Sequence, residues 1–276
     1  MVTISLKKTR DFIYQNGLLW ERALFSWLFE RGSLHHLYQC LRCYKNMDGG
    51  YGHGLEPDIR TPESHPLALE YLLFILVFYQ IPPEDLLFGT TKWVSEQQNE
   101  DGSLKNPDSV KDYPHAAWWT DGGQHIPLSV VGLLHFFGRT TSGMLERTSN
   151  WAQANYSIEH IENNDWLFAA YHAVNYFFNI DQYPDLAKHQ DATVDNVQKL
   201  LEARPEKGSE AIFQLAPFPD SLIIVALPDE LIQRELDRLL DTYLDNGSWH
   251  DEHNLPYWYV GATIANLTTL QRHGRI

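Results

Sequence analysis

The sequence predicts an all-α protein. Three observations support this fold class: apolar residues recur at helical spacing along most of the chain, Gly and Pro residues separate these periodic segments, and convincing strands are scarce. The chain has 276 residues, of which 43% are hydrophobic and 21% charged. A globular chain of this length buries about three quarters of the surface that its unfolded form exposes. We therefore expect one domain that spans residues 1–276.

The helices of the first half follow from the spacing of apolar residues and from the residues that end each segment. An N-terminal helix carries Phe12 and Tyr14, and Gly32 ends the amphipathic segment that follows it. Ser64 is a candidate N-cap for the apolar run that begins at Pro66. The periodic segments of this half are 18–28, 34–44, 66–79 and 84–98.

The second half of the chain continues the same pattern. Its predicted helices are 126–137, 142–155, 165–179, 184–203, 221–227, 229–244 and 257–272. Residues 222–226 are rich enough in β-branched side chains to form a strand, but a single strand has nothing to pair with. About twelve helices result, joined by alternately short and long loops.

The charge balance limits the partners that we expect. Asp and Glu number 36 and Lys and Arg number 21, which gives a formal net charge of −15. Such a field repels phosphate backbones, and no Lys/Arg-rich tract offsets it locally. Neither nucleic acid nor an anionic membrane surface is therefore an expected partner, and a small-molecule substrate is the partner that we predict. The sequence does not determine the oligomeric state.

Hydropathy and cysteine content indicate a cytoplasmic location. The longest apolar stretch, residues 71–79, is far shorter than the roughly 20 residues of a membrane-spanning helix. Residues 1–10 lack the apolar core of a secretory signal. The two cysteines, Cys40 and Cys43, are too few for a disulfide framework, and their spacing is typical of two residues on one helix.

Three loops share one pattern, in which Asp or Asn precedes Gly, then Gly or Ser, and then an aromatic or aliphatic residue. These repeat loops are 45–51, 98–104 and 244–249. Gly49 and Gly102 are 53 residues apart, and Gly102 and Gly247 are 145 apart, close to three periods of about 50. Because a period of about 50 holds two helices and their loops, the chain is expected to contain five to six helical hairpins.

The Asx-Gly pair of each repeat loop has a structural explanation. Glycine after a helix accepts a positive φ and so ends the helix. The Asx side chain can bind backbone N–H groups of its own loop. We therefore expect structural roles for Asp48, Asp101 and Asn246.

The Gln-x-x-Asp-Gly-Ser form of residues 98–103, with its relatives in the other two repeat loops, resembles the QW repeat of the terpenoid cyclase and protein prenyltransferase superfamily. The resemblance implies an α/α toroid of about six helical hairpins, in which inner helices ring a central cavity. It also implies an enzyme that acts on an isoprenoid or a similar apolar substrate in an acidic, aromatic cavity.

The chemistry of the superfamily does not transfer to particular residues. Neither the Asp-x-Asp-Asp motif that protonates an alkene nor the Asp-Asp-x-x-Asp motif that binds diphosphate occurs in the chain. Similar toroids carry polysaccharide lyases and glycoside hydrolases, and a fold does not determine an activity. A carbohydrate-active lyase or hydrolase and a non-catalytic ligand-binding or scaffold toroid are therefore alternatives.

Three long loops carry the candidate chemistry: the first loop (48–65), the second loop (112–125) and the third loop (249–259). The first is rich in glycine, and Pro57 fixes the spacing of Glu56 and Asp58. A long loop with this composition favours function, the alternative being a buried salt-bridge network with Arg60. The second loop places two adjacent tryptophans beside His and Asp residues, as a sugar-stacking or cation-stabilising platform or as a packing lid.

We expect the three loops to converge around one cavity. The candidate catalytic residues are Glu56, Asp58, His115 and Asp121. The candidate substrate-binding residues are Tyr51, His53, Arg60, His65, Trp118, Trp119, Trp249, Trp258 and Tyr259.

No cofactor is expected. In the third loop His250, Asp251 and His253 have close spacing for a divalent metal, but three ligands from one short loop rarely hold zinc without a distant fourth. The remaining histidines, His172 among them, are expected to be ordinary packing or surface residues, although the aromatic helix that holds Tyr171 and His172 is a candidate to face the cavity.

Overall fold

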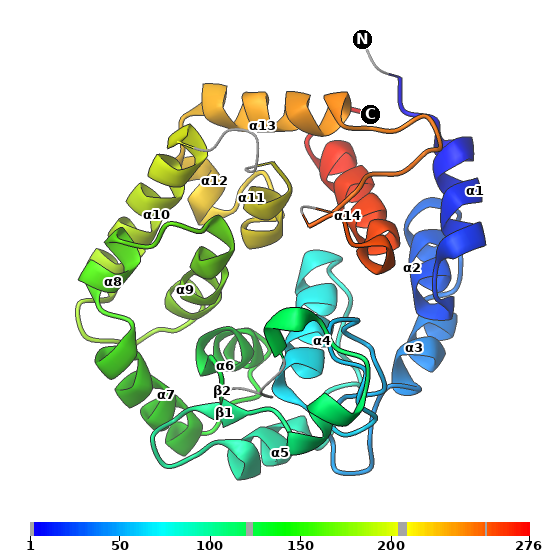
Figure 1. Ribbon diagram of the computed structural model, residues 1–276. Coiled ribbons are helices and arrows are strands. Elements are labelled where there is room, and N and C mark those ends of the chain that lie inside the picture. Colours follow the sequence, from blue (N-terminus) through cyan, green and yellow to red (C-terminus); the bar gives the residue numbers. More distant parts are fainter. Residues whose placement is uncertain (1–2, 120–123, 204–208, 252) are drawn as a thin grey trace. The chain divides into compact units, whose positions relative to one another are not determined.

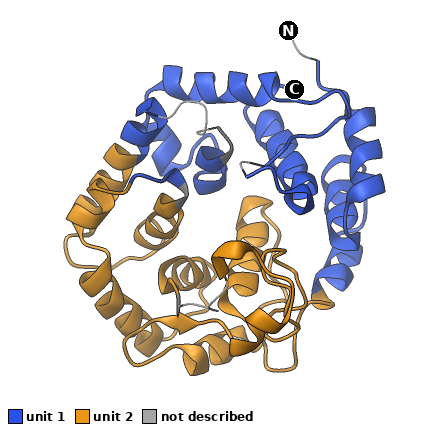
Figure 2. Cartoon of the chain, in the orientation of Figure 1, with its two compact units in different colours: residues 1–41, 165–168, 197–276 blue, residues 42–164, 169–196 orange. Residues whose placement is uncertain are grey.

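The computed structural model describes residues 3–119, 124–203, 209–251 and 253–276. Within these ranges the chain forms fourteen α-helices and two strands of two residues each, which confirms the all-α class (Figure 1). The chain forms two compact units (Figure 2). Unit 1 comprises residues 1–41, 165–168 and 197–276, and unit 2 comprises residues 42–164 and 169–196.

Unit 2 contains the middle helices of the chain and the strand pair. Its elements are α4 (Pro66–Phe78), α5 (Thr90–Gln97), β1 (Leu104–Lys105), β2 (Gln124–His125), α6 (Pro127–Phe136), α7 (Ser142–Asn155), α8 (Ile158–Glu162) and α9 (Ala170–Phe177). The two strands are antiparallel, with Leu104 opposite His125. Short 3-10 helices cover Asp108–Asp112 and Ala117–Trp119.

Unit 1 contains the first and the last helices. Its elements are α1 (Leu6–Asn16), α2 (Leu19–Phe29), α3 (Leu34–Arg42, whose last residue belongs to unit 2), α11 (Ser209–Leu215), α12 (Leu222–Ala226), α13 (Asp229–Asp241), the 3-10 helix Pro256–Trp258 and α14 (Tyr259–Arg272). The helix α10 (Leu186–Ala203) begins in unit 2 and ends in unit 1. The β-branched segment 222–226 is helical, as predicted.

The core of unit 2 is built from α4, α6 and α9. The helix α6 packs against α4 on one side and α9 on the other (Figure 1). Both α4 and α6 are apolar around most of their circumference and bury most of their residues. A Cβ atom at Gly132 would collide with the Asn175 carbonyl, so glycine permits the close approach of α6 to α9.

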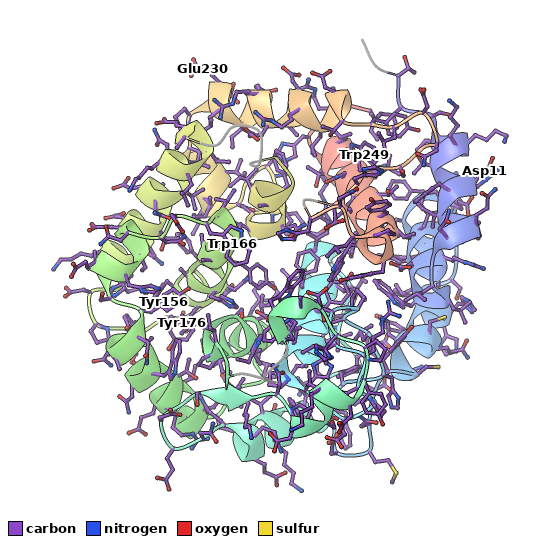
Figure 3. The ribbon with its side chains drawn as sticks, in the orientation of Figure 1. Asp11, Tyr156, Trp166, Tyr176, Glu230 and Trp249 are labelled. Carbon is purple, nitrogen blue, oxygen red and sulfur yellow. The ribbon has the colours of Figure 1, made fainter. Side chains whose placement is uncertain are left out.

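The core of unit 1 surrounds α14. This helix packs against α1, α2, α11 and α13, and its residues Val260 and 262–270 are buried. Trp249 lies beside α14 (Figure 3) and is fully buried. Its backbone N–H donates to the Thr263 hydroxyl at 3.0 Å, and its indole N–H donates to the Leu239 carbonyl at 2.7 Å.

The repeat loops have the structural role that the sequence predicts. In each loop the Asx oxygen accepts the backbone N–H two residues later, Asp48 from Gly50, Asp101 from Ser103 and Asn246 from Ser248. The glycine between them has a φ of +93° in Gly49, +89° in Gly102 and +94° in Gly247. Each loop is therefore closed by its own Asx turn, and residues outside it add further hydrogen bonds, as Ser64 does to Asp48.

Two local predictions were wrong. The N-cap of α4 is His65, whose Nδ1 accepts the Ala68 N–H at 3.2 Å, because the Ser64 hydroxyl donates instead to Asp48 at 2.8 Å. The helix predicted from residue 84 begins only at Thr90. Glu84 and Gly89 have φ values of +41° and +79°, outside the right-handed helical region, so a regular helix forms only after Gly89.

Across the described part of the chain, no helix combines the length and hydrophobicity that crossing a membrane requires.

Candidate active site

The first and second loops lie against each other in unit 2. Ile59 and His115 form an antiparallel bridge, and the Ala116 N–H donates to the Asp58 carbonyl at 2.8 Å. Two of the three predicted loops are therefore neighbours. The candidate residues that this pairing brings together are Glu56, Asp58, His115 and Trp118.

Glu56 and Asp58 form a buried carboxyl pair, with exposed fractions of 4% and 8%. The carboxylate of Glu56 accepts the backbone N–H of Asp58 at 3.0 Å, so Pro57 holds the two groups at a fixed spacing. Burial, reinforced by the charge of Asp58, raises the pKa of Glu56 well above its ordinary value. A carboxyl with a raised pKa can keep its proton near neutral pH, which a general acid requires.

Asp58 orients an exposed aromatic ring. The indole N–H of Trp118 donates to the Asp58 carboxylate at 3.0 Å, and 55% of the Trp118 side chain is exposed. Arg60 is exposed as well, and its Nε donates to the Pro57 carbonyl at 3.4 Å. The second loop thus presents a large ring face to solvent next to a buried acid pair.

His115 is oriented by its own loop. Its Nδ1 lies 2.7 Å from the Tyr113 carbonyl, an acceptor, so Nδ1 carries the proton. In the neutral ring Nε2 is then the proton acceptor. The side chain is partly exposed, which leaves this nitrogen in reach of a bound molecule or water.

A second cluster, which the sequence did not predict, lies at the N-terminal ends of α4, α6 and α9. Glu70 is buried, and its carboxylate lies 2.8 Å from His125 Nε2 and 3.5 Å from His172 Nδ1. The fully buried hydroxyl of Ser129 donates to Glu70 and lies 2.8 Å from His172 Nδ1. We call these four residues the Glu70 cluster.

The Glu70 cluster stabilises a buried negative charge on the Glu70 carboxylate. Burial alone raises the pKa of Glu70, but His125, His172 and the Ser129 hydroxyl outweigh it and lower that pKa below its ordinary value. Burial lowers the pKa of His172 to about 4. At neutral pH Glu70 is therefore ionised and His172 is neutral.

The loop pair and the Glu70 cluster lie near each other in unit 2. The charge of Glu70 contributes to the raised pKa of Glu56, after burial and the charge of Asp58. The Trp119 ring lies 6.4 Å from the His125 ring, centroid to centroid. We call the loop pair together with the Glu70 cluster the acid–base site.

Several predicted residues serve packing. Tyr51 is fully buried and its hydroxyl donates to the Leu86 carbonyl at 2.7 Å. His53 is exposed and its Nε2 lies 2.9 Å from the side-chain oxygen of Asn46. Trp249 is used by the core of unit 1, as described above. Their roles in substrate binding stay predictions.

The third loop belongs to unit 1. Trp258 and Tyr259 are partly buried, and the Tyr259 ring stacks on His250 with centroids 4.3 Å apart. Asp251 accepts the backbone N–H groups of His253 and Leu255.

Convergence of the third loop with the other two stays a prediction. Asp121 lies outside the described residues. Where residues are described, no group of three His, Cys, Asp or Glu side chains is arranged to hold a metal ion.

The missed residues left a weak signal in the sequence. Glu70 is the one charged residue in the apolar run 66–79, and a carboxyl on a buried helix requires buried partners. Ser129 and His172 lie on other apolar helices, 59 and 102 residues further along the chain. Nothing in their spacing shows that they meet Glu70.

Comparisons of the chain with models of protein families, with curated proteins and with solved structures gave no match. The function is therefore argued from the acid–base site alone.

Proposed function

We propose that the chain is an acid–base enzyme that cleaves a glycosidic bond, with its catalytic residues in unit 2. The observation that carries this proposal is the pairing of the first and second loops, which brings the buried Glu56 and the partly exposed His115 together. The pKa of Glu56 is raised and that of Glu70 is lowered, so one keeps its proton while the other is charged. A carboxyl that keeps its proton can act as a general acid, and the charge of Glu70 contributes to raising the pKa of Glu56.

In the proposed reaction Glu56 is the general acid. It donates its proton to the oxygen that leaves as the C–O bond of the sugar breaks. His115 accepts through Nε2 a proton from the water that adds to the anomeric carbon. Proton transfer by a positioned side chain contributes about 100-fold to 10,000-fold to the rate.

The polar character of the site favours a sugar over an isoprenoid. Seven of its side chains are Glu56, Asp58, Glu70, His115, His125, Ser129 and His172. These groups suit a substrate with many hydroxyls, and the exposed face of Trp118 suits a sugar ring. An isoprenoid would instead bury an apolar chain against them at a cost in desolvation.

The fold that we propose is the α/α toroid that the resemblance implies. Its support is the repeat loop, which occurs in both units with the same Asx turn and the same positive φ. Small-angle scattering of the purified chain tests this arrangement independently of any activity.

The experiment is a turnover screen with the purified protein. Neutral and acidic oligosaccharides are assayed for new reducing ends, and isoprenyl diphosphates are assayed for products by mass spectrometry. We expect reducing ends from one class of oligosaccharide. Absorbance of an unsaturated sugar would show elimination in place of hydrolysis, and would overturn the role of His115 toward water.

Matched variants connect the activity to the site. Glu56→Gln removes the acid proton and is expected to lower turnover by about 100-fold or more. Glu63→Gln, an exposed carboxyl of the same loop, is expected to leave turnover unchanged. The proposal is refuted if the protein turns over isoprenyl diphosphates alone or none of the substrates. It is also refuted if Glu56→Gln is as active as the wild type.

A further inference from the structure

Two buried N–H groups beside His125 point to a binding subsite. The Nε2 atom of His65 and the Nε1 atom of Trp119 are buried, and neither has a hydrogen-bond partner among the residues that the structure describes. A buried donor without an acceptor is costly, so such atoms are rare in folded proteins. Where two of them adjoin a candidate active site, a bound group is the natural acceptor.

The hydrogen bond of His65 to its own helix shows which nitrogen carries the proton. Nδ1 accepts the backbone N–H of Ala68 at 3.2 Å, so this nitrogen is unprotonated. The single ring proton is therefore on Nε2, which makes this atom a donor. The ring is fully buried, and burial, assisted by His125, lowers the pKa of His65 to about 3, so the ring stays neutral.

Trp119 differs from Trp118 and Trp249. The indole N–H of its neighbour Trp118 has an acceptor in Asp58, and that of Trp249 has one in the Leu239 carbonyl. The Trp119 N–H is buried without such an acceptor in the described residues. Indole N–H is a donor only, so an acceptor atom has to come from elsewhere.

His125 is linked to both donors. His125 influences His65 electrostatically, and its ring centroid lies 6.4 Å from that of Trp119. His65 is also the N-cap of the 13-residue helix α4, so the positive end of the helix dipole lies at the same place. An electron-rich oxygen is therefore favoured over a donor group.

The charges around His125 favour a neutral oxygen over an anion. The carboxylate of Glu70 lies 2.8 Å from His125 Nε2, and both orphan donors belong to uncharged rings. The Glu70 carboxylate would repel an added negative charge, as would the net charge of −15 of the chain. A carboxylate or phosphate would be repelled where a hydroxyl or carbonyl would not.

We infer that His65 Nε2–H and Trp119 Nε1–H bind an acceptor oxygen of a neutral ligand. If the proposed function holds, on which this identity of the ligand rests, the oxygen is a hydroxyl or ring oxygen of the sugar. His65 and Trp119 are then binding residues that place the sugar next to the Glu70 cluster.

Nuclear magnetic resonance of the ¹⁵N-labelled full chain tests the inference without any turnover. The probes are methyl β-glucoside and acetamide, which are neutral, and acetate, which is an anion. We expect the Trp119 indole and His65 Nε2–H signals to move to lower field, saturably, with the neutral probes and not with acetate. Trp119→Phe, which keeps an aromatic ring, assigns the indole signal by its disappearance.

Variants measure what the two donors contribute. Trp119→Phe and His65→Asn, which retains an N-cap oxygen, are each expected to weaken binding of methyl β-glucoside about 2-fold to 10-fold. Trp166→Phe, at an exposed indole of unit 1 (Figure 3), is the control and is expected to leave binding unchanged. Thermal unfolding of each variant shows that it is folded at the temperature of the measurement.

The outcomes separate this inference from the proposed function. Signals that do not respond to the neutral probes refute the subsite, even when oligosaccharides are cleaved. A larger response to acetate also refutes it, because the ligand would then be an anion. Saturable responses to the neutral probes without any turnover support the subsite and refute the glycosidase.

Discussion

The repeat loops and the acid–base site treat buried polar groups in opposite ways. In the repeat loops each Asx oxygen accepts from its own loop, as Asp101 does from the N–H and hydroxyl of Ser103. In the Glu70 cluster, by contrast, buried polar groups have partners far away in the sequence, as Glu70 has in Ser129 and His172. The donors of His65 and Trp119 have no acceptor among the described residues. Polar side chains therefore close a loop in the first case, and in the second they leave hydrogen-bond donors available to a ligand.

The position of the hydrogen-bond partners in the sequence therefore separates structural polar groups from candidate functional ones. A loop that satisfies itself contributes stability locally and leaves nothing for a ligand to bind. A buried group whose partners come from distant helices costs free energy unless those partners hold it. Buried polar groups of this kind lower stability unless they are held in place, so we expect them where they serve a function. This expectation supports our functional proposal.

The largest effect on stability is expected at Glu70. Glu70→Ala removes the carboxylate from between His125, His172 and Ser129 and leaves their polar atoms buried, which should lower the free energy of unfolding by about 3–5 kcal/mol. Because the pKa of Glu70 is lowered in the fold, its contribution is present above its ordinary value of 4.5 and is lost as the pH falls through the lowered pKa. Urea unfolding at pH 7 and in acid measures both.

The outcome at Glu70 decides whether the cluster is stabilised as a unit. Glu70→Gln retains the size of the side chain and one acceptor, so a smaller loss is expected. Equal free energies of unfolding of the wild type and Glu70→Ala at pH 7 would show that the long-range partners of Glu70 do not stabilise the fold.

A comparable effect is expected at a repeat-loop glycine. Gly102 has a φ of +89°, and a Cβ atom there would collide with the Arg147 carbonyl and lie 2.9 Å from the Trp151 Cβ. Gly102→Ala should therefore cost at least about 3 kcal/mol, from backbone strain and from overpacking. Thermal or urea unfolding measures the cost. Turnover per folded molecule should not change, and its loss would show that the repeat loop has a role in the site.

A smaller effect, opposite in sign, is expected at Glu21 in unit 1. Its carboxylate accepts the Leu18 N–H at 2.6 Å, and burial raises its pKa from 4.5 to about 7. A raised carboxyl pKa gives stability that is present below pH 4.5 and falls as the pH rises to about 7. Glu21→Gln, which stays uncharged, should gain about 2–3 kcal/mol over the wild type between pH 4 and pH 8.

Glu56→Gln is the matched variant in unit 2. The pKa of Glu56 is also raised, so the stability of this variant relative to the wild type should rise with pH in the same direction. Only Glu56→Gln should lower turnover. If the stability of either Gln variant relative to the wild type falls as the pH rises, the replaced glutamate does not have the raised pKa of a buried, protonated carboxyl.

The smallest effect is expected at an Asx turn. Asp101→Ala removes the acceptor for the Ser103 N–H and hydroxyl in a solvent-accessible loop and should cost about 1 kcal/mol. Asp101→Asn retains the acceptor and should cost less than half of that. A loss in Asp101→Ala as large as that in Glu70→Ala would remove the distinction between self-closed loops and the acid–base site.

Local sequence determined the elements of this protein. The all-α class, the helical state of 222–226 and the Asx turns at Asp48, Asp101 and Asn246 follow from residues that are near one another in the chain. Composition also marked the first and second loops as unusual, and these loops do pair, through Ile59 and His115. Short-range steric and hydrogen-bonding preferences act within a few residues, and so they can be predicted without the fold.

Tertiary structure alone decided the chemistry of the acid–base site. Glu70 and Ser129 are 59 positions apart in the chain, and Ser129 and His172 are 43 positions apart. They meet only because α6 packs against both α4 and α9. The raised pKa of Glu56 and the lowered pKa of Glu70 depend on burial and on those neighbours. Burial and long-range charge are properties of the packed helices, which is why two glutamates of one chain have pKa values shifted in opposite directions.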